Sequence, residues 1–154
     1  MKKNELVIQI LNYIDLNIFS LSSIDELAHI FHYNKDYIMR VFKKELNITI
    51  IEYIQNKKRY LSLPLLENSF DSILKISLLA GFNSQEYYCE IFKKVIGVSP
   101  NLYRKFIFHN KNISFDVIYD IQNHIISLKN LMNRINNYSI VIEPKSKLSL
   151  SLFS

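Results

Sequence analysis

The chain has 154 residues, of which 49% are hydrophobic, and its formal net charge is +5. This content is enough for one or two small cores and argues against a disordered chain. No apolar run approaches the roughly 20 residues of a membrane span, and Glu5, Asn12 and Asp15 interrupt any signal-peptide core. We therefore expect a cytoplasmic protein. The mild positive charge is compatible with nucleic acid but does not identify it.

Residue types that build metal sites and catalytic centres are scarce. Cys89 is the only cysteine, which excludes an internal disulfide or a thiolate cage. The four histidines form no ligand set with carboxylates or thiols, so we expect no metal and no cofactor. Two glycines are too few for a phosphate-cradling loop, and no nucleophile has an activating setting. The sequence thus disfavours an enzyme.

The first half of the chain predicts four helices. Apolar spacing gives a helix over 5–17 and another over 35–46, which Asn47 can end in the left-handed conformation. Between them, the Ser23 capping box opens a short helix. The Thr49 capping box opens a long helix that reaches about residue 67.

The stretch 81–104 predicts a turn, a helix and the start of another helix. Gly81 suits the turn, and Asn83 or Ser84 can cap the helix that follows. Gly97 is placed to end that helix. Ser99 then caps the next helix, with Pro100 at its first position.

These two regions repeat each other. The pattern Tyr37-x4-Phe42-Lys43-Lys44 recurs 50 residues later, and Thr49 to Tyr53 recurs as Ser99 to Tyr103 with the same shift. The preceding short helices match with a shift of 49, so two copies of a helix-turn-helix unit are joined by the long helix. The alternative is an ordinary helical bundle with chance similarity.

Residues from about Glu5 to Arg104 resemble the DNA-binding domain of the AraC/XylS transcription regulators. The resemblance rests on the following residues: Gly81-Phe82, Tyr88, Phe92-Lys93-Lys94, Gly97, Ser99-Pro100, Tyr103-Arg104 and, in the first unit, Leu27-Ala28, Tyr33, Arg40, Phe42-Lys43-Lys44 and Tyr53. It implies an all-α fold with two helix-turn-helix subdomains, each placing a recognition helix in the major groove. The short segment before the first helix resembles the layout of the small stand-alone activators of the family.

The family's base-contacting positions fall on six residues: Asp36, Met39 and Arg40 in the first recognition helix, and Gln85, Glu86 and Glu90 in the second. Arginine matches O6 and N7 of guanine, and glutamine suits adenine. Asp36 either accepts from cytosine or caps its helix. Glu90 departs from the arginine that the family commonly has there, which predicts weaker DNA binding by the second unit.

Phosphate contacts are expected at the starts of both recognition helices and at their lysines. The candidates are Asn34, Lys35, Lys43, Lys44, Ser84, Lys93 and Lys94. For the two lysine pairs, the alternative is a solvated face, and we expect one lysine of each pair to lie near the backbone.

Two residues of the long connecting helix, Pro64 and Arg59, also depart from the family pattern. Proline inside a helix removes a backbone hydrogen bond and clashes with the carbonyl four residues earlier. We expect a kink near Tyr60 or a restart around Pro64. Arg59 stands where the family prefers an apolar residue.

Residues 106–154 form a C-terminal extension to the DNA-binding domain of residues 1–105. After a linker over 106–112, a helix over about 114–136 carries an apolar seam at Ile118, Ile121, Ile125, Leu128, Met132 and Ile135. The seam fits either a coiled coil that forms a homodimer or, slightly better, packing on the chain's own domain. Alternation over 138–143 and 147–153 predicts a short β-hairpin.

The sequence therefore favours a transcription regulator that reads double-stranded DNA with two recognition helices, with RNA polymerase as a further expected partner and no membrane. The alternative is a protein-interaction or dimerisation module with weak DNA binding.

Overall fold

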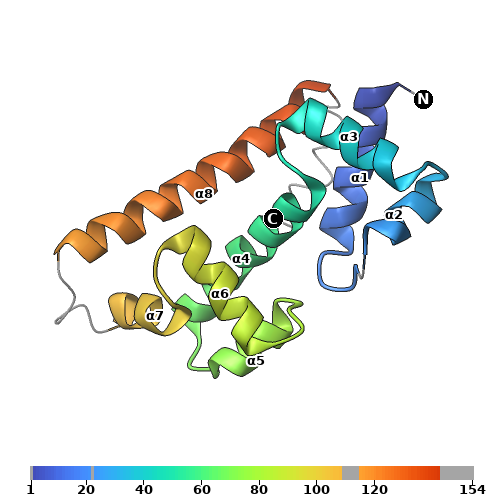
Figure 1. Cartoon of the computed structure of the whole chain (residues 1–154). Helices are drawn as coiled ribbons and strands as arrows, with labels where there is room; N and C mark the ends of the chain where they lie inside the picture. Colours follow the sequence, from blue (N-terminus) through green and yellow to red (C-terminus); the bar gives the residue numbers. More distant parts are fainter. Residues whose placement is uncertain (1, 22, 109–114, 143–154) are drawn as a thin grey trace. The chain divides into compact units, whose positions relative to one another are not determined.

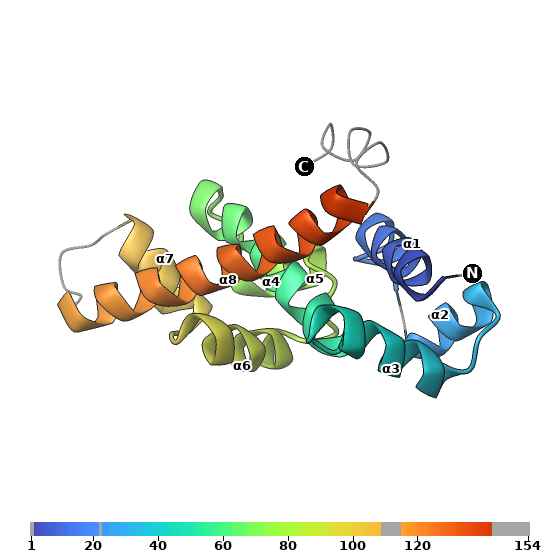
Figure 2. The same ribbon diagram turned by 90° about the horizontal axis from the view of Figure 1, so that it is seen from above.

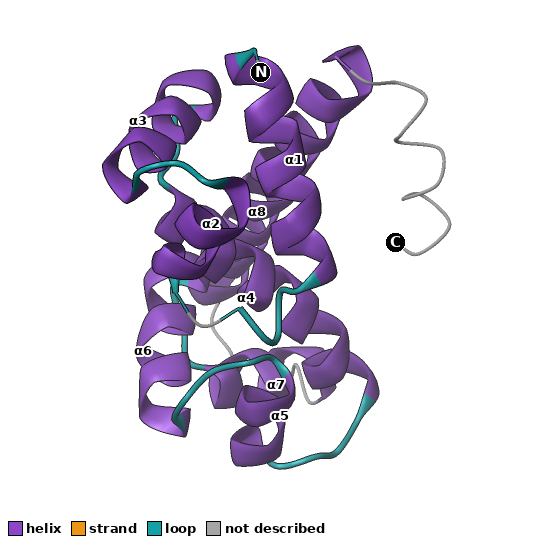
Figure 3. Ribbon diagram, turned by 90° about the vertical axis from the view of Figure 1, so that its right-hand side faces the viewer, coloured by secondary structure: helices purple, strands orange, loops and turns teal. Residues whose placement is uncertain are grey.

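A computed structural model describes residues 2–21, 23–108 and 115–142. Within these ranges the chain forms helices and no strands (Figure 3). The helices, labelled in Figure 1, are α1 (Lys3–Leu16), α2 (Ile24–Phe31), α3 (Lys35–Leu46), α4 (Ile50–Asn68), α5 (Ile73–Leu79), α6 (Gln85–Ile96), α7 (Pro100–Phe108) and α8 (Phe115–Ile142). None of the described helices is long and apolar enough to cross a bilayer.

The helices belong to two compact units. The first contains the described parts of 1–17, 21–53 and 130–154, and the second contains 18–20 and the described parts of 54–129. Apart from residues 18–20, the chain passes from the first unit to the second within α4, and back within α8.

In the first unit, α1 and α2 both pack against α3 (Figure 2). The inward sides of α1 and α3 are apolar, and Ile10, Ile14, Ile38 and Phe42 are buried. Tyr53, at the start of α4, packs its ring near Phe42 and donates its hydroxyl to Asp15 Oδ1 at 2.6 Å. This pairing lets a buried tyrosine keep a hydrogen-bond partner.

In the second unit, α6 contacts both α5 and α7. Its core is aromatic: the rings of Tyr88 and Phe92 lie 5.7 Å apart, and that of Tyr103 lies 5.7 Å from Phe92. The Tyr103 hydroxyl donates to Glu67 of α4.

The predicted helix caps are confirmed. Ser23, Ser84 and Ser99 each accept a backbone N–H three residues ahead. At Thr49 both halves of the capping box form, because Thr49 Oγ1 accepts from the Glu52 amide and Glu52 accepts from the Thr49 amide. Asn47 ends α3 with φ +56°, and Gly97 ends α6 with φ +91°.

The two-fold repeat is also present in three dimensions. Residues 41–50 and 91–100 show the same order of buried, half-buried and exposed positions, residue for residue. In α5, the three buried residues are Ile73, Ile76 and Ser77, those that the repeat pairs with Ile24, Leu27 and Ala28. The structure therefore supports two copies of one unit over a chance similarity.

Three boundary predictions were wrong. α4 is one helix from Ile50 to Asn68, so the restart around Pro64 was wrong, whereas the kink near Tyr60 stays a prediction; Pro64 itself is exposed. α7 continues to Phe108, where a linker from Phe106 had been expected. α8 continues to Ile142, so 138–142 is helical and not a strand. The second predicted strand, 147–153, lies outside the described residues.

Most of the apolar seam of α8 is buried within the chain, whereas Ile118 and Ile125 are half-buried. Ile121, Leu128, Met132 and Ile135 each have at most 5% of their surface exposed. This agrees with the packing alternative, in which the helix serves the chain's own core.

Candidate functional site

The outward side of α3 carries the predicted base readers of the first unit. Ile38, Val41, Phe42 and Leu46 hold the opposite side of the helix in the core. Asp36 and Arg40 are exposed, as are Lys43 and Lys44, while Met39 is half-buried. The 3.6-residue period of the helix thus brings these side chains to one accessible face.

Asn34 caps α3, because its side-chain oxygen accepts the Asp36 amide at 2.8 Å. The alternative in which Asp36 itself caps the helix was wrong, and its carboxylate lies exposed in the first turn. Lys35, predicted to contact phosphate, pairs with the exposed carboxylate of Asp25 at 3.5 Å. A pair of this exposure is weak and is readily exchanged for another anion.

Aromatic side chains border Arg40. Its guanidinium carbon lies 5.6 Å from the centre of the Tyr37 ring, which stacks on Tyr33 at 5.2 Å. Such contacts are favourable at an exposed site and leave the guanidinium donors in solvent. Unlike Arg40, Lys43 has a hydrogen bond at the end of its own helix, because its Nζ donates to the Asn47 carbonyl at 3.5 Å.

The corresponding face of α6 is acidic at its start. Glu86 and Glu90 are exposed and Gln85 is half-buried, while Lys93 and Lys94 are exposed near the end. The predicted phosphate contact Ser84 uses its oxygen to cap the helix, accepting the Tyr87 amide at 3.1 Å. Burial and the Glu86 charge raise the pKa of the Cys89 thiol, which disfavours the reactive thiolate.

Three hydrogen bonds from α4 hold α6 and the turn before it. Lys58 Nζ donates to the Gly81 carbonyl at 3.0 Å, and Gln55 donates to the Tyr87 hydroxyl at 2.6 Å. The Tyr88 hydroxyl donates to Ser62 Oγ at 2.9 Å. No local sequence signal predicts these contacts, because their partners lie 23 to 32 positions apart.

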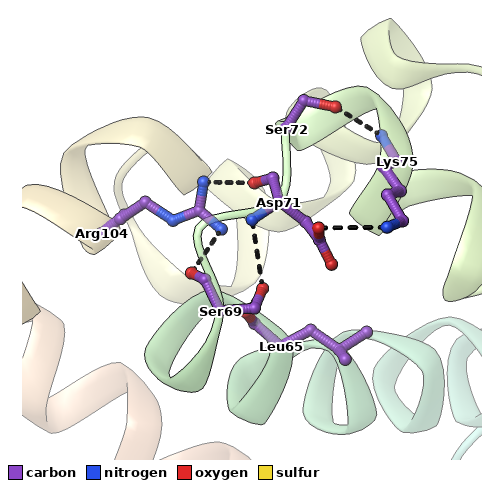
Figure 4. A network of polar contacts seen from close by, with 6 residues as sticks. All are labelled: Leu65, Ser69, Asp71, Ser72, Lys75 and Arg104. Carbon is purple, nitrogen blue, oxygen red and sulfur yellow. Dashed lines mark hydrogen bonds and ion pairs between the residues drawn. The ribbon is translucent and has the colours of Figure 1, made fainter.

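Arg104 fastens the α4–α5 loop to α7. Its guanidinium donates to the carbonyls of Asp71, at 2.6 Å, and Ser69, at 3.3 Å (Figure 4). Lys75 adds an ion pair with Asp71 at 3.1 Å. Arg104 is one of the residues on which the family resemblance rests, and here its part is structural.

Arg59 is buried in α4, with 4% of its surface exposed. It donates to Asn56 and Gln55, and its Nε has no hydrogen-bond partner among the residues that the structure describes. Burial lowers its pKa to about 10, so it stays charged at neutral pH. In the described part of the chain, no group of three or more histidine, cysteine or carboxylate side chains is placed to hold a metal ion.

A family model described as "Helix-turn-helix domain" matches residues 27–105, about half of the chain. The transcriptional activator AarP of Providencia stuartii is 29% identical over 102 residues, which are 66% of this chain and 76% of AarP. The melibiose operon regulatory protein of Escherichia coli K12 is 33% identical over 99 residues. That match covers 64% of this chain but only 33% of the regulator.

Solved structures share the fold. The C-terminal domain of AraT, a response regulator from Geobacillus stearothermophilus, aligns with a TM-score of 0.63 and 26% identity over 71% of this chain and 92% of that domain. The DNA-binding domain of the transcriptional factor AdpA, solved with a target DNA, aligns with a TM-score of 0.61 over 69% of this chain and 97% of that domain. Because its sequence identity is only 17%, the second match supports the fold alone.

Proposed function

The chain belongs to the AraC/XylS family of helix-turn-helix transcription regulators, and from this membership we propose that α3 and α6 each read base edges in a major groove of double-stranded DNA. The protein is a DNA-binding transcription regulator. The proposal adds which side chains read the DNA.

The exposed face of α3 carries the proposal. Its apolar side is fixed in the core, Asn34 caps its start, and Arg40 is free to extend from the surface. A helix held from behind with a polar edge exposed fits the major groove. We assign guanine reading to Arg40, contact with a thymine methyl to Met39, and acceptance from cytosine N4 to Asp36.

Phosphate contacts fall to the exposed lysines. Lys43, Lys44, Lys93 and Lys94 are all exposed near the ends of the two helices. Lys35 joins them by exchanging its ion pair with Asp25 for a phosphate. Asn34 and Ser84 act through the helix starts, since their side chains already order the first-turn amides that face an anion.

We assign the weaker part of the recognition to α6. Gln85 suits adenine, whereas the exposed carboxylates of Glu86 and Glu90 repel phosphate and accept only from cytosine. This acidic face is also what favours the second candidate function, a protein-interaction module with weak DNA binding.

Three further assignments complete the proposal. The protein acts without catalysis in the cytoplasm and contacts RNA polymerase when it regulates transcription. A homodimer through α8 would have to withdraw Leu128 and Met132 from the chain's own core, so we expect a monomer in light-scattering measurements.

Selection of binding sites from random double-stranded DNA tests the reading. The wild-type chain, Arg40→Ala and Gln85→Ala are each used at physiological salt. We expect the two variants to lose base preference at separate positions, about one helical turn apart. Lys105→Ala is the control, because it removes an exposed charge outside α3 and α6.

The outcomes separate the two candidate functions. Retained preference in both variants would show that other residues read the bases. A wild-type chain that selects no sequence and binds DNA only at low salt would support the interaction module instead.

A further inference from the structure

The last turn of the first recognition helix is held by residues of α8. Arg134 Nη1 donates to the Leu46 carbonyl at 2.7 Å, and the Tyr138 hydroxyl donates to Glu45 Oε2 at 3.1 Å. Both contacts lie within the first unit and join residues 88 and 93 positions apart.

The chemistry of a helix end explains why these contacts matter. The last four carbonyls of a helix lack partners within it and carry the negative end of the helix dipole. In α3, the Asn47 amide turns back to the Lys43 carbonyl, and Arg134 brings a positive charge and a donor to Leu46. An arginine is suited to this place, because it stays charged and is rigid at its end.

Tyr138 provides a second hydrogen bond from α8 to the end of α3. Its ring is half-buried, and burial together with the neighbouring Glu45 carboxylate raises the pKa of its hydroxyl, so the donor is present at neutral pH. Met132 and Ile135, on the same half of α8, are buried. The polar contacts are therefore anchored by an apolar side of α8.

A parallel contact occurs at the equivalent place in the second unit. A Cβ added at Gly97, which ends α6, would lie 3.0 Å from Cε1 of His124 in α8. Gly97 follows Asn47 by the 50-residue shift of the repeat. In each unit, α8 thus meets the residues that end the recognition helix.

We propose that Arg134 and Tyr138 are positioning residues for DNA reading, which set the direction of α3 by holding its C-terminal end. The extension helix is then part of the reading apparatus of the first unit. This inference rests on the proposed function, since it assumes that α3 reads bases.

Base discrimination of Arg134→Met tests the inference. On the site selected by the wild-type chain, we expect a loss of affinity of about tenfold, the equivalent of one hydrogen bond to a charged group. The preference for particular bases should weaken at the base pairs that depend on Arg40. It should be unchanged at the base pairs that depend on Gln85. A variant that merely destabilised the fold would lose both preferences together.

Lys129→Met is the control, and two further variants extend the test. Lys129→Met removes an exposed charge from α8 and should bind as the wild type does. Arg134→Lys keeps a cationic donor and should recover part of the lost discrimination. Tyr138→Phe removes one hydroxyl, spares the fold and should reduce affinity by about threefold.

The two proposals fail in different ways. If the wild-type chain selects a site but Arg134→Met and Tyr138→Phe keep every base preference, the positioning role is refuted and the reading by α3 stands. If the wild-type chain selects no site, the proposed function fails and takes this inference with it.

Discussion

A buried hydrogen-bond relay links the second recognition helix to α4. The Tyr88 hydroxyl donates to Ser62 Oγ at 2.9 Å, and Ser62 Oγ donates to the Arg59 carbonyl at 2.7 Å. Neither Tyr88 nor Ser62 has any exposed surface. Burial raises the pKa of Tyr88 to about 12, so the hydroxyl keeps its proton at neutral pH.

The two single variants should differ in cost. Tyr88→Phe removes the donor but leaves Ser62 bonded to the Arg59 carbonyl and keeps the ring contacts with Phe82 and Phe92. We expect a loss of about 1 kcal/mol in the free energy of unfolding. Ser62→Ala leaves the Tyr88 hydroxyl buried without a partner, and we expect a loss of about 2 kcal/mol.

The double variant carries the sharper prediction. Once both hydroxyls are gone, no polar group is stranded, so the combined loss should be about 1.5 kcal/mol instead of the sum of the two. Urea unfolding at pH 7 measures each value from the midpoint and slope. Ser77→Ala is the matched control, because Ser77 is a buried serine whose hydroxyl bonds within its own helix, to the Leu74 carbonyl.

Two results would refute this reasoning. One is a loss for Ser62→Ala no larger than that for Ser77→Ala, which would mean that the Tyr88 hydroxyl finds another partner. The other is additivity in the double variant, which would mean that the two hydroxyls do not act as a pair.

Three more predictions follow from the helix ends, the α4–α5 loop and the acidic face. Gly97→Ala should cost about 2 kcal/mol in urea unfolding, because φ is +91° and the new Cβ would press on His124; Asn47→Gly, at φ +56°, should cost nothing. Arg104→Met should cost about 2 kcal/mol and speed amide exchange over 69–72, whereas Lys105→Met should do neither. Glu90→Arg should raise DNA affinity and steepen the salt slope by about 0.9 in titrations at several salt concentrations; unchanged affinity would count against the place given to α6.

Local chemistry accounts for the parts of the fold that the sequence predicted well. A cap such as Thr49 with Glu52 involves residues three apart, so both partners are visible in a short window of sequence. The left-handed ends at Asn47 and Gly97 are equally local. The recognition-helix faces followed because helical period alone separates Phe42 from Arg40.

Long-range packing accounts for the rest. Residues 138–142 alternate like a strand. No proline or glycine separates them from the preceding helix, and the first proline after them is Pro144, so the helix continues through them. The contact of Arg134 with Leu46 spans 88 positions and has no local signature. The restart expected around Pro64 does not occur, because Pro64 is exposed and the helix runs through it.

The burial patterns of 41–50 and 91–100 match, so in each copy the residues that pack in the core are distinct from those that face outward. The buried residues match in position between the copies and are mostly aliphatic or aromatic in both, with Ile50 and Pro100 as the exception. In the proposed reading the outward residues contact DNA, and the two copies differ there, with Arg40 in one and Glu90 in the other. Operator preference can therefore drift in evolution, or be exchanged by grafting the face of α3 onto α6, with little change to the core that keeps either helix folded.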